Sequence, residues 1–169
     1  MATDNLTTAR LDLVPLTATD AEDLFPVFDD PALGRWTGAA PPADVEALRR
    51  RFAAWETGPP HGSEERWLNW AMRRRPDGRA VGHLQSTVVG DGAAVALVVG
   101  TAFQGQGFAT EAARALVRWL RETGIATIEA SIHPDNVASQ VVASRAGLHP
   151  TDRIDDGEVV WSFAAGAAS

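Results

Sequence analysis

The chain has 169 residues and 18.0 kDa, the size of one globular domain, and its 45% of hydrophobic residues suffice for a sizeable core. Fifteen Lys and Arg residues against 22 Asp and Glu give a net charge of −7, which argues against a nucleic-acid partner because phosphate binding relies on a basic excess. Cysteine is absent, which excludes disulfides, thiolate metal sites, iron–sulfur clusters and a cysteine nucleophile.

The first half of the chain predicts a strand, two helices and then an antiparallel meander. Apolar residues from Val45 to Trp55 recur at helical spacing, and two turn sequences, Pro76-Asp77-Gly78 and Gly90-Asp91-Gly92, connect runs of strand-forming residues. In chain order we expect a strand at 11–14, a helix at 21–28, a loop at 29–36, a helix at 45–55, and strands at 67–72, 79–89 and 93–99.

The second half alternates helices and strands. A glycine-rich loop at 100–107 precedes helix 108–122, strand 125–132, a helix from 137 to about Gly147, and strands 152–154 and 158–163 around an Asp-Gly turn. This order predicts one mixed α/β domain over residues 1–163, followed by a frayed C-terminal tail at 164–169.

The loop from Gly100 to Thr110 has the pattern of an anion site, because a strand, a glycine-rich turn and a helix start present backbone N–H groups to a phosphate. A P-loop fails because no Lys follows Gly105. A dinucleotide fingerprint is weakened because Thr110 stands where its third glycine belongs, although Glu129 has about the right spacing for the ribose contact. A turn with no ligand, in which the glycines only permit unusual dihedrals, is a further alternative.

A further interpretation of the loop rests on a family resemblance. Gln104-x-x-Gly107-x-Ala109 resembles the Gln/Arg-x-x-Gly-x-Gly/Ala signature of the GNAT superfamily of N-acetyltransferases. The segments 8–13, 103–112, 133–139 and 146–148 resemble its ribosomal-protein N-acetyltransferase (RimJ/RimL-type) branch. The resemblance implies a single GNAT-like domain, with a mixed, mostly antiparallel central sheet of about seven strands flanked by about four helices. It also implies an acetyl-CoA-dependent enzyme that uses no metal and acetylates a primary amine, on a protein N-terminus or a small molecule, by direct attack in a ternary complex.

Coenzyme A has a pyrophosphate and an arm with two amides, and both have candidate partners. Backbone groups of the loop are expected to hold the pyrophosphate, and the edge of the preceding strand is expected to pair with the arm. The expected contacts are Leu97, Val98, Val99, Gln104, Gly105, Gln106, Gly107, Phe108, Ala109 and Thr110. The resemblance also implies that the strand after Ile125 splays away to admit the arm.

Further along the chain, the resemblance assigns Asn136 to a cofactor amide and Ser139 to the neighbourhood of the sulfur, where it could protonate the leaving thiolate. The alternative is that Asn136 caps a helix and Ser139 is a first-turn residue, and both readings can hold together. Arg145 either meets the nucleotide phosphates or belongs to a solvated helix face.

The sequence does not identify the residue that takes the proton from the acceptor amine. Relatives often carry a Glu in the fourth strand, where this chain has Ala94, and a Tyr acid, whereas this chain has no tyrosine. The remaining candidates are His83 and His133, whose ordinary pKa suits the task, together with Asp91, Glu64 and Glu65, or a water without a dedicated base.

Two tryptophans, Trp36 and Trp55, belong to the helical insertion that by resemblance lines the acceptor pocket, although core packing is an equal alternative for Trp55. Two other functions stay open: a non-catalytic module that binds an acyl-CoA or small ligand, favoured by Ala94 and the missing tyrosine, and transfer of another acyl group.

The first ten residues lack a signal-peptide core and no window reaches the ~18 apolar residues of a membrane span, so we expect a cytoplasmic protein with no membrane partner. We expect it to be a monomer or a homodimer.

Overall fold

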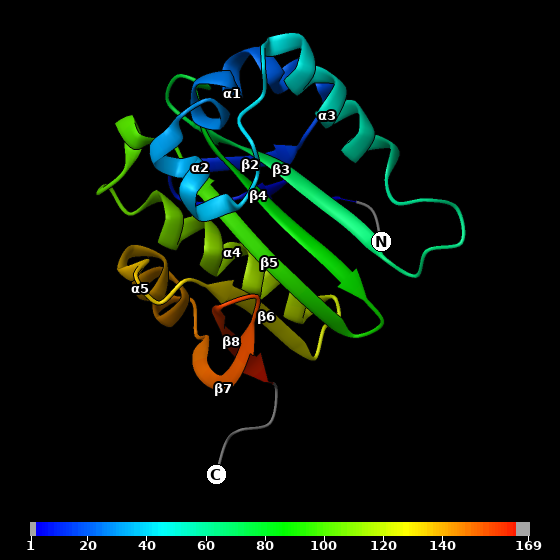
Figure 1. The fold of residues 1–169 in the computed structure, drawn as a ribbon, viewed down its shortest axis with the longest axis vertical. Coiled ribbons are helices and arrows are strands. Elements are labelled where there is room, and N and C mark those ends of the chain that lie inside the picture. Colours follow the sequence, from blue (N-terminus) through cyan, green and yellow to red (C-terminus); the bar gives the residue numbers. More distant parts are fainter. Residues whose placement is uncertain (1–2, 165–169) are drawn as a thin grey trace.

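A central sheet of eight strands, in the spatial order β1-β2-β3-β4-β5-β6-β8-β7, organises the computed structural model, which describes residues 3–164 (Figure 1). All neighbouring strands are antiparallel except β5 and β6, which are parallel. The strands are β1 (Leu6–Thr7), β2 (Leu11–Pro15), β3 (Arg66–Arg74), β4 (Ala80–Val89), β5 (Gly92–Val99), β6 (Thr127–Ile132), β7 (His149–Asp155) and β8 (Glu158–Ala164).

Helices cover both faces of the sheet, and each face has its own apolar core. The helices are α1 (Ala21–Phe28), α2 (Pro31–Thr37), α3 (Val45–Thr57), α4 (Phe108–Glu122) and α5 (Val137–Arg145), with short 3-10 helices at Ala18–Asp20 and Thr101–Phe103. The buried stripe Phe108, Ala112, Leu116 and Leu120 packs α4 on one face, where α5 joins it. On the other face α1 and α3 form a second core around Phe52.

The expected mixed α/β architecture is confirmed, with one strand and one helix more than predicted. The added strand is the two-residue β1, which is too short to carry a periodic signal. The added helix is α2, in the segment expected to be a loop: Asp30 caps it by accepting the N–H of Ala32 at 2.9 Å, and Pro31 occupies its first turn.

Other element boundaries differ by a few residues. Strand β6 begins at Thr127 rather than at 125, and β7 begins at His149 rather than at 152, with an irregular register between Pro150 and Ile154. Strand β8 continues through Ala164, one residue past the expected end of the domain, and the rest of the predicted tail lies outside the described residues. Within residues 3–164, no helix is long and apolar enough to cross a membrane.

The sheet opens between its two parallel strands. Strands β5 and β6 are paired only from Gly92 with Thr127 to Ala94 with Glu129. Beyond that point β5 continues along β4 up to Val99, and β6 continues along β8 up to Ile132. The two strand edges that face each other therefore carry unpaired backbone groups.

Candidate functional site

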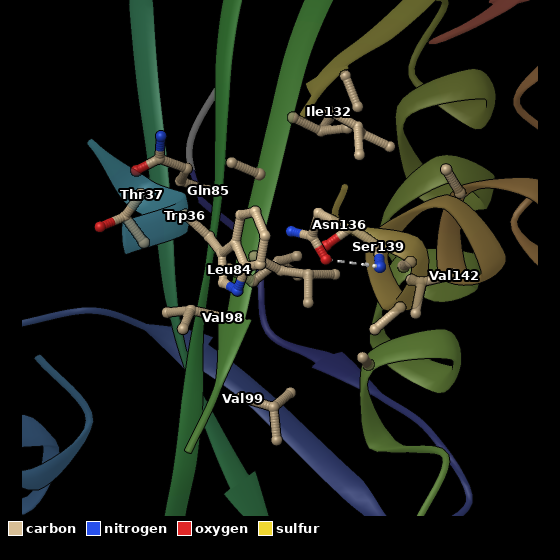
Figure 2. A pocket seen from close by; sticks show the side chains of 18 of the residues that line it. Trp36, Thr37, Leu84, Gln85, Val98, Val99, Ile132, Asn136, Ser139 and Val142 are labelled. Carbon is tan, nitrogen blue, oxygen red and sulfur yellow. Dashed lines mark hydrogen bonds between the residues drawn. The ribbon is translucent and has the colours of Figure 1, made fainter. Parts of the chain in front are cut away.

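A cavity of about 1640 Å³ occupies the opening between β5 and β6 and extends to both faces of the sheet. Residues of α2, β4, β5, β6 and α5 line it (Figure 2), together with residues of the glycine loop and of α4. The volume exceeds the roughly 300–1,000 Å³ of an ordinary small-molecule pocket, so it has room for two substrates at once. All of the expected cofactor-binding and acceptor-binding residues except Gln106 line this cavity, as do Ser139, His83 and His133.

The predicted arm-binding segment, Leu97 to Val99, lies on the open edge of β5. These residues keep their partners on β4, where Val99 is opposite Gly82, but have none on β6. The position of Gly82 is tight, because an added Cβ would lie 2.2 Å from the carbonyl oxygen of Val98. An extended chain with amide groups could add to the open edge as a further strand.

The glycine loop presents unpaired donors to the same cavity. Gly105 and Gly107 adopt positive φ values of 75° and 84°, which favour glycine. The first backbone bond of α4 runs from Glu111 N–H to the carbonyl of Gly107. In the part of the chain that the structure describes, the N–H groups from Gly105 to Thr110 have no acceptor, so they and the helix dipole present donors suited to an anion. The Gln104 side chain anchors the loop by donating to the carbonyl of Val99 at 3.1 Å.

An ion pair that sequence reasoning missed holds this loop from behind. Arg10 donates through Nη1 to the carbonyl of Gln106 and through Nε to Glu111 Oε2, each at 2.7 Å. Burial raises the pKa of Glu111, but hydrogen bonds from Thr8 and Arg10 outweigh that effect and lower it. Arg10 and Glu111 are 101 residues apart, so no local pattern could have revealed the pair.

Asn136 and Ser139 lie at the start of α5, on the wall opposite β5. Asn136 caps the helix, because its Oδ1 accepts the N–H of Ser139 at 3.2 Å (Figure 2). This leaves the side-chain NH₂ of Asn136 and the hydroxyl of Ser139 without a hydrogen-bond partner within residues 3–164. Arg145, at the other end of α5, is exposed at the rim of the cavity.

Trp36 reaches from α2 to the loop that follows β6. Its ring lies 5.7 Å from the ring of His133, and the Arg35 guanidinium covers it at 4.1 Å. The hydroxyl of Thr101 donates to Asp30 Oδ2 at 2.5 Å, which ties the start of α2 to the glycine loop. Trp36 and His133 lie against each other, and both line the cavity. Nδ1 of His133 accepts the N–H of Asp135 at 3.1 Å, which leaves Nε2 as the protonated nitrogen of the neutral ring.

His83 lies deeper, within an aromatic cluster. Its ring stacks on Trp55 at 5.2 Å and lies 5.5 Å from Phe28, and its Nε2 pairs with Asn69 Oδ1 at 3.0 Å. Burial lowers the pKa of His83 to about 3. The ring is therefore neutral at pH 7 and a weak proton acceptor, so this environment favours packing for both His83 and Trp55.

The carboxylates that line the cavity differ from those that the sequence analysis named as candidate proton acceptors. Asp91, Glu64 and Glu65 do not line it. The carboxylates that do line it are Glu129, Asp155 and Glu158. The small side chain of Ala94, which is in register with Glu129, leaves space beside the Glu129 carboxylate. No group of three potential metal ligands occurs among residues 3–164.

Comparison with known proteins gives one family and many structural relatives. The model of the acetyltransferase (GNAT) domain family matches residues 10–149. A search of curated proteins by sequence finds no significant match.

Several solved structures share the fold. RimJ of Mycobacterium smegmatis in complex with CoA-disulfide is 22% identical with a TM-score of 0.79, over 98% of this chain and 90% of that one. RimL, a ribosomal L7/L12 alpha-N-protein acetyltransferase in complex with coenzyme A, is 16% identical with a TM-score of 0.77, over 98% and 100%. The aminoglycoside acetyltransferase AAC(6')-Ib in complex with coenzyme A is 18% identical with a TM-score of 0.70, over 91% and 94%.

Proposed function

The chain belongs to the GNAT family of acetyl-CoA-dependent acetyltransferases, and we propose that it transfers the acetyl group to the nitrogen of a primary amine by direct attack within a ternary complex. The acceptor is a protein N-terminus or a small-molecule amine. The solved structures that share its fold include an enzyme described as acting on a ribosomal protein and one described as acting on aminoglycosides.

One observation carries the proposal: the open edge of β5 leads directly to the unpaired N–H groups of Gly105 to Thr110, and both line one cavity. A pyrophosphate at the helix start and a diamide arm along the strand edge are the two features of coenzyme A that this arrangement matches. We assign these contacts to the donor, together with Asn136 on α5 and Arg145 at the rim.

The proposed reaction balances without a metal ion or a covalent enzyme intermediate. The acceptor ammonium loses one proton, and its nitrogen then attacks the thioester carbonyl carbon. A C–N bond forms, the C–S bond breaks, the nitrogen loses a second proton, and one proton is taken up by the thiolate. We assign the last step to the free hydroxyl of Ser139. His133 can accept the amine proton only where its Nδ1 releases the N–H of Asp135, because Nε2 carries the proton of the neutral ring. His83 is a weaker candidate because of its low pKa.

The test is the release of free coenzyme A from acetyl-CoA in the presence of a panel of amines, including peptides with free N-termini. A thiol reagent is well suited to this assay because the chain has no cysteine of its own. Turnover with intersecting double-reciprocal lines supports a ternary complex, whereas parallel lines indicate a covalent intermediate. Tight binding of acetyl-CoA with no turnover on any acceptor would favour the binding module instead. We place the reaction in the cytoplasm.

A further inference from the structure

Three side chains form a row across the sheet at the point where β5 and β6 separate. Thr87 on β4 is opposite Ala94 on β5, and Ala94 is in register with Glu129 on β6. Ala94 and Glu129 are the last pair before the strands diverge. Glu129 therefore lies at the closed end of the gap between β5 and β6 that we assign to the acyl donor. The arm of coenzyme A cannot extend past this point, because the two strands are paired there.

The row faces away from α4. The neighbours Ala93 and Ile128 are buried in the core that α4 covers, and successive side chains of a strand point to opposite faces. Ala94 and Glu129 accordingly share the other face and line the cavity. Because Ala94 is exposed and ends at Cβ, the space beside the Glu129 carboxylate is open.

A second charged residue holds Glu129 in place. Arg153 on β7 pairs with Glu129 through Nη2 and Oε1. Oε2 of Glu129 has no hydrogen-bond partner within residues 3–164, and the side chain is 30% exposed. The carboxylate is thus oriented by the ion pair while one oxygen stays available to a ligand.

We propose that Glu129 binds the ammonium group of the acceptor amine, with Arg153 as the positioning residue and Ala94 as the floor that admits the amine. The assignment rests on the proposed function and deepens it, because it makes the acceptor a cationic, aliphatic amine. A carboxylate oxygen accepts N–H bonds from an ammonium and holds its nitrogen at the closed end of the gap, where the thioester carbonyl must lie for attack. Thr87 and Gln85, on the same face of β4, supply further polar groups beside the proposed ammonium position.

The other two carboxylates of the cavity are placed differently. Asp155 and Glu158 are the last pair of the β7–β8 hairpin, directly beside its turn. They belong to the rim of the cavity, away from the point where β5 and β6 separate.

The test compares Glu129→Gln with Glu122→Gln, an exposed control at the end of α4, in steady-state assays that vary each substrate in turn. We expect Glu129→Gln to raise the KM for an aliphatic amine at least tenfold and to change the KM for acetyl-CoA less than twofold. Glu122→Gln should leave both values unchanged. A purely structural effect would change both KM values of Glu129→Gln together, and that result would overturn the assignment.

A second variant keeps the test decisive if Glu129→Gln fails to fold. Ala94→Leu fills the space beside the carboxylate from an exposed position and should also raise the KM for the amine at least tenfold. An unchanged KM for the amine in Ala94→Leu overturns the assignment. So does a raised KM for the amine in Glu158→Gln when Glu129→Gln leaves that KM unchanged. In either case a wild type that turns over amines leaves the proposed function standing. A wild type that turns over no amine removes the proposed function and the assignment with it.

Discussion

Replacing Gly107 by Val tests whether the glycine loop binds the pyrophosphate. Gly107 precedes α4 with φ of 84°, and an added Cβ would lie 3.2 Å from Arg10 Nη2. The positive φ costs a residue other than glycine about 1–2 kcal/mol. For a chain of this size the melting temperature should fall by about 2–8 °C. We also expect acetyl-CoA affinity to fall about 10- to 100-fold, since one hydrogen bond to a charged group contributes about 1.5–3 kcal/mol.

Gly124 at the other end of α4 provides the matched control. It has φ of 93°, an added Cβ there meets nothing within 4 Å, and it does not line the cavity. Gly124→Val should therefore show a similar thermal destabilisation with unchanged affinity, because the backbone strain is comparable and the anion site is intact.

Calorimetric titration of acetyl-CoA into both folded variants, with thermal melts of each, separates strain from binding. If Gly107→Val binds acetyl-CoA within twofold of Gly124→Val, the backbone of this loop does not hold the pyrophosphate. A melting temperature that falls in neither variant would show that the positive φ of these glycines is not a constraint.

Three further predictions concern the walls of the cavity. Ser139→Ala should lower kcat by about 10- to 100-fold with a smaller effect on acetyl-CoA binding, whereas Asn136→Ala should chiefly weaken binding; full kcat in Ser139→Ala when chemistry limits the rate would favour release of the thiolate as an anion. Trp36→Ala should alter the KM for the acceptor and nearly preserve acetyl-CoA affinity, and a collapse of that affinity in a folded variant would place Trp36 in the donor site instead. Burial lowers the pKa of His83 from 6.5 to about 3, so between these pH values the unfolded chain binds a proton that the folded chain does not. The free energy of unfolding should therefore fall as pH is lowered from 6.5 toward 3, by up to about 1.4 kcal/mol per pH unit; urea denaturation at several pH values should show this component in wild type and not in His83→Gln.

Some structural features were readable in the sequence although we did not predict them. Asp30 followed by Pro31 is a helix-start signature, and Gly38 ends the same helix in the left-handed conformation. We expected a loop in this segment instead. The two-residue β1 had no such signal, because two residues are too few to show an alternating pattern.

The glycine loop and the helix cap that we assign to the donor formed as expected, because their determinants are local. The glycines before α4, the cap at Asn136 and the turn between β7 and β8 depend on residues within a few positions of one another. The same locality made the helix stripes and the strands of the meander recognisable from spacing alone.

The acceptor half was decided by tertiary structure. His83 looks like a free base in the sequence, but α1 and α3 fold over it and burial lowers its pKa. Glu129 has about the right spacing in the sequence for a ribose contact, and only the register of β5 and β6 sets it beside Ala94. The sequence by itself therefore determined most of the elements, the caps and the glycine loop, which depend on short-range contacts. The separation of β5 from β6, and the residues it brings together, depend on pairings between distant segments that no local pattern encodes.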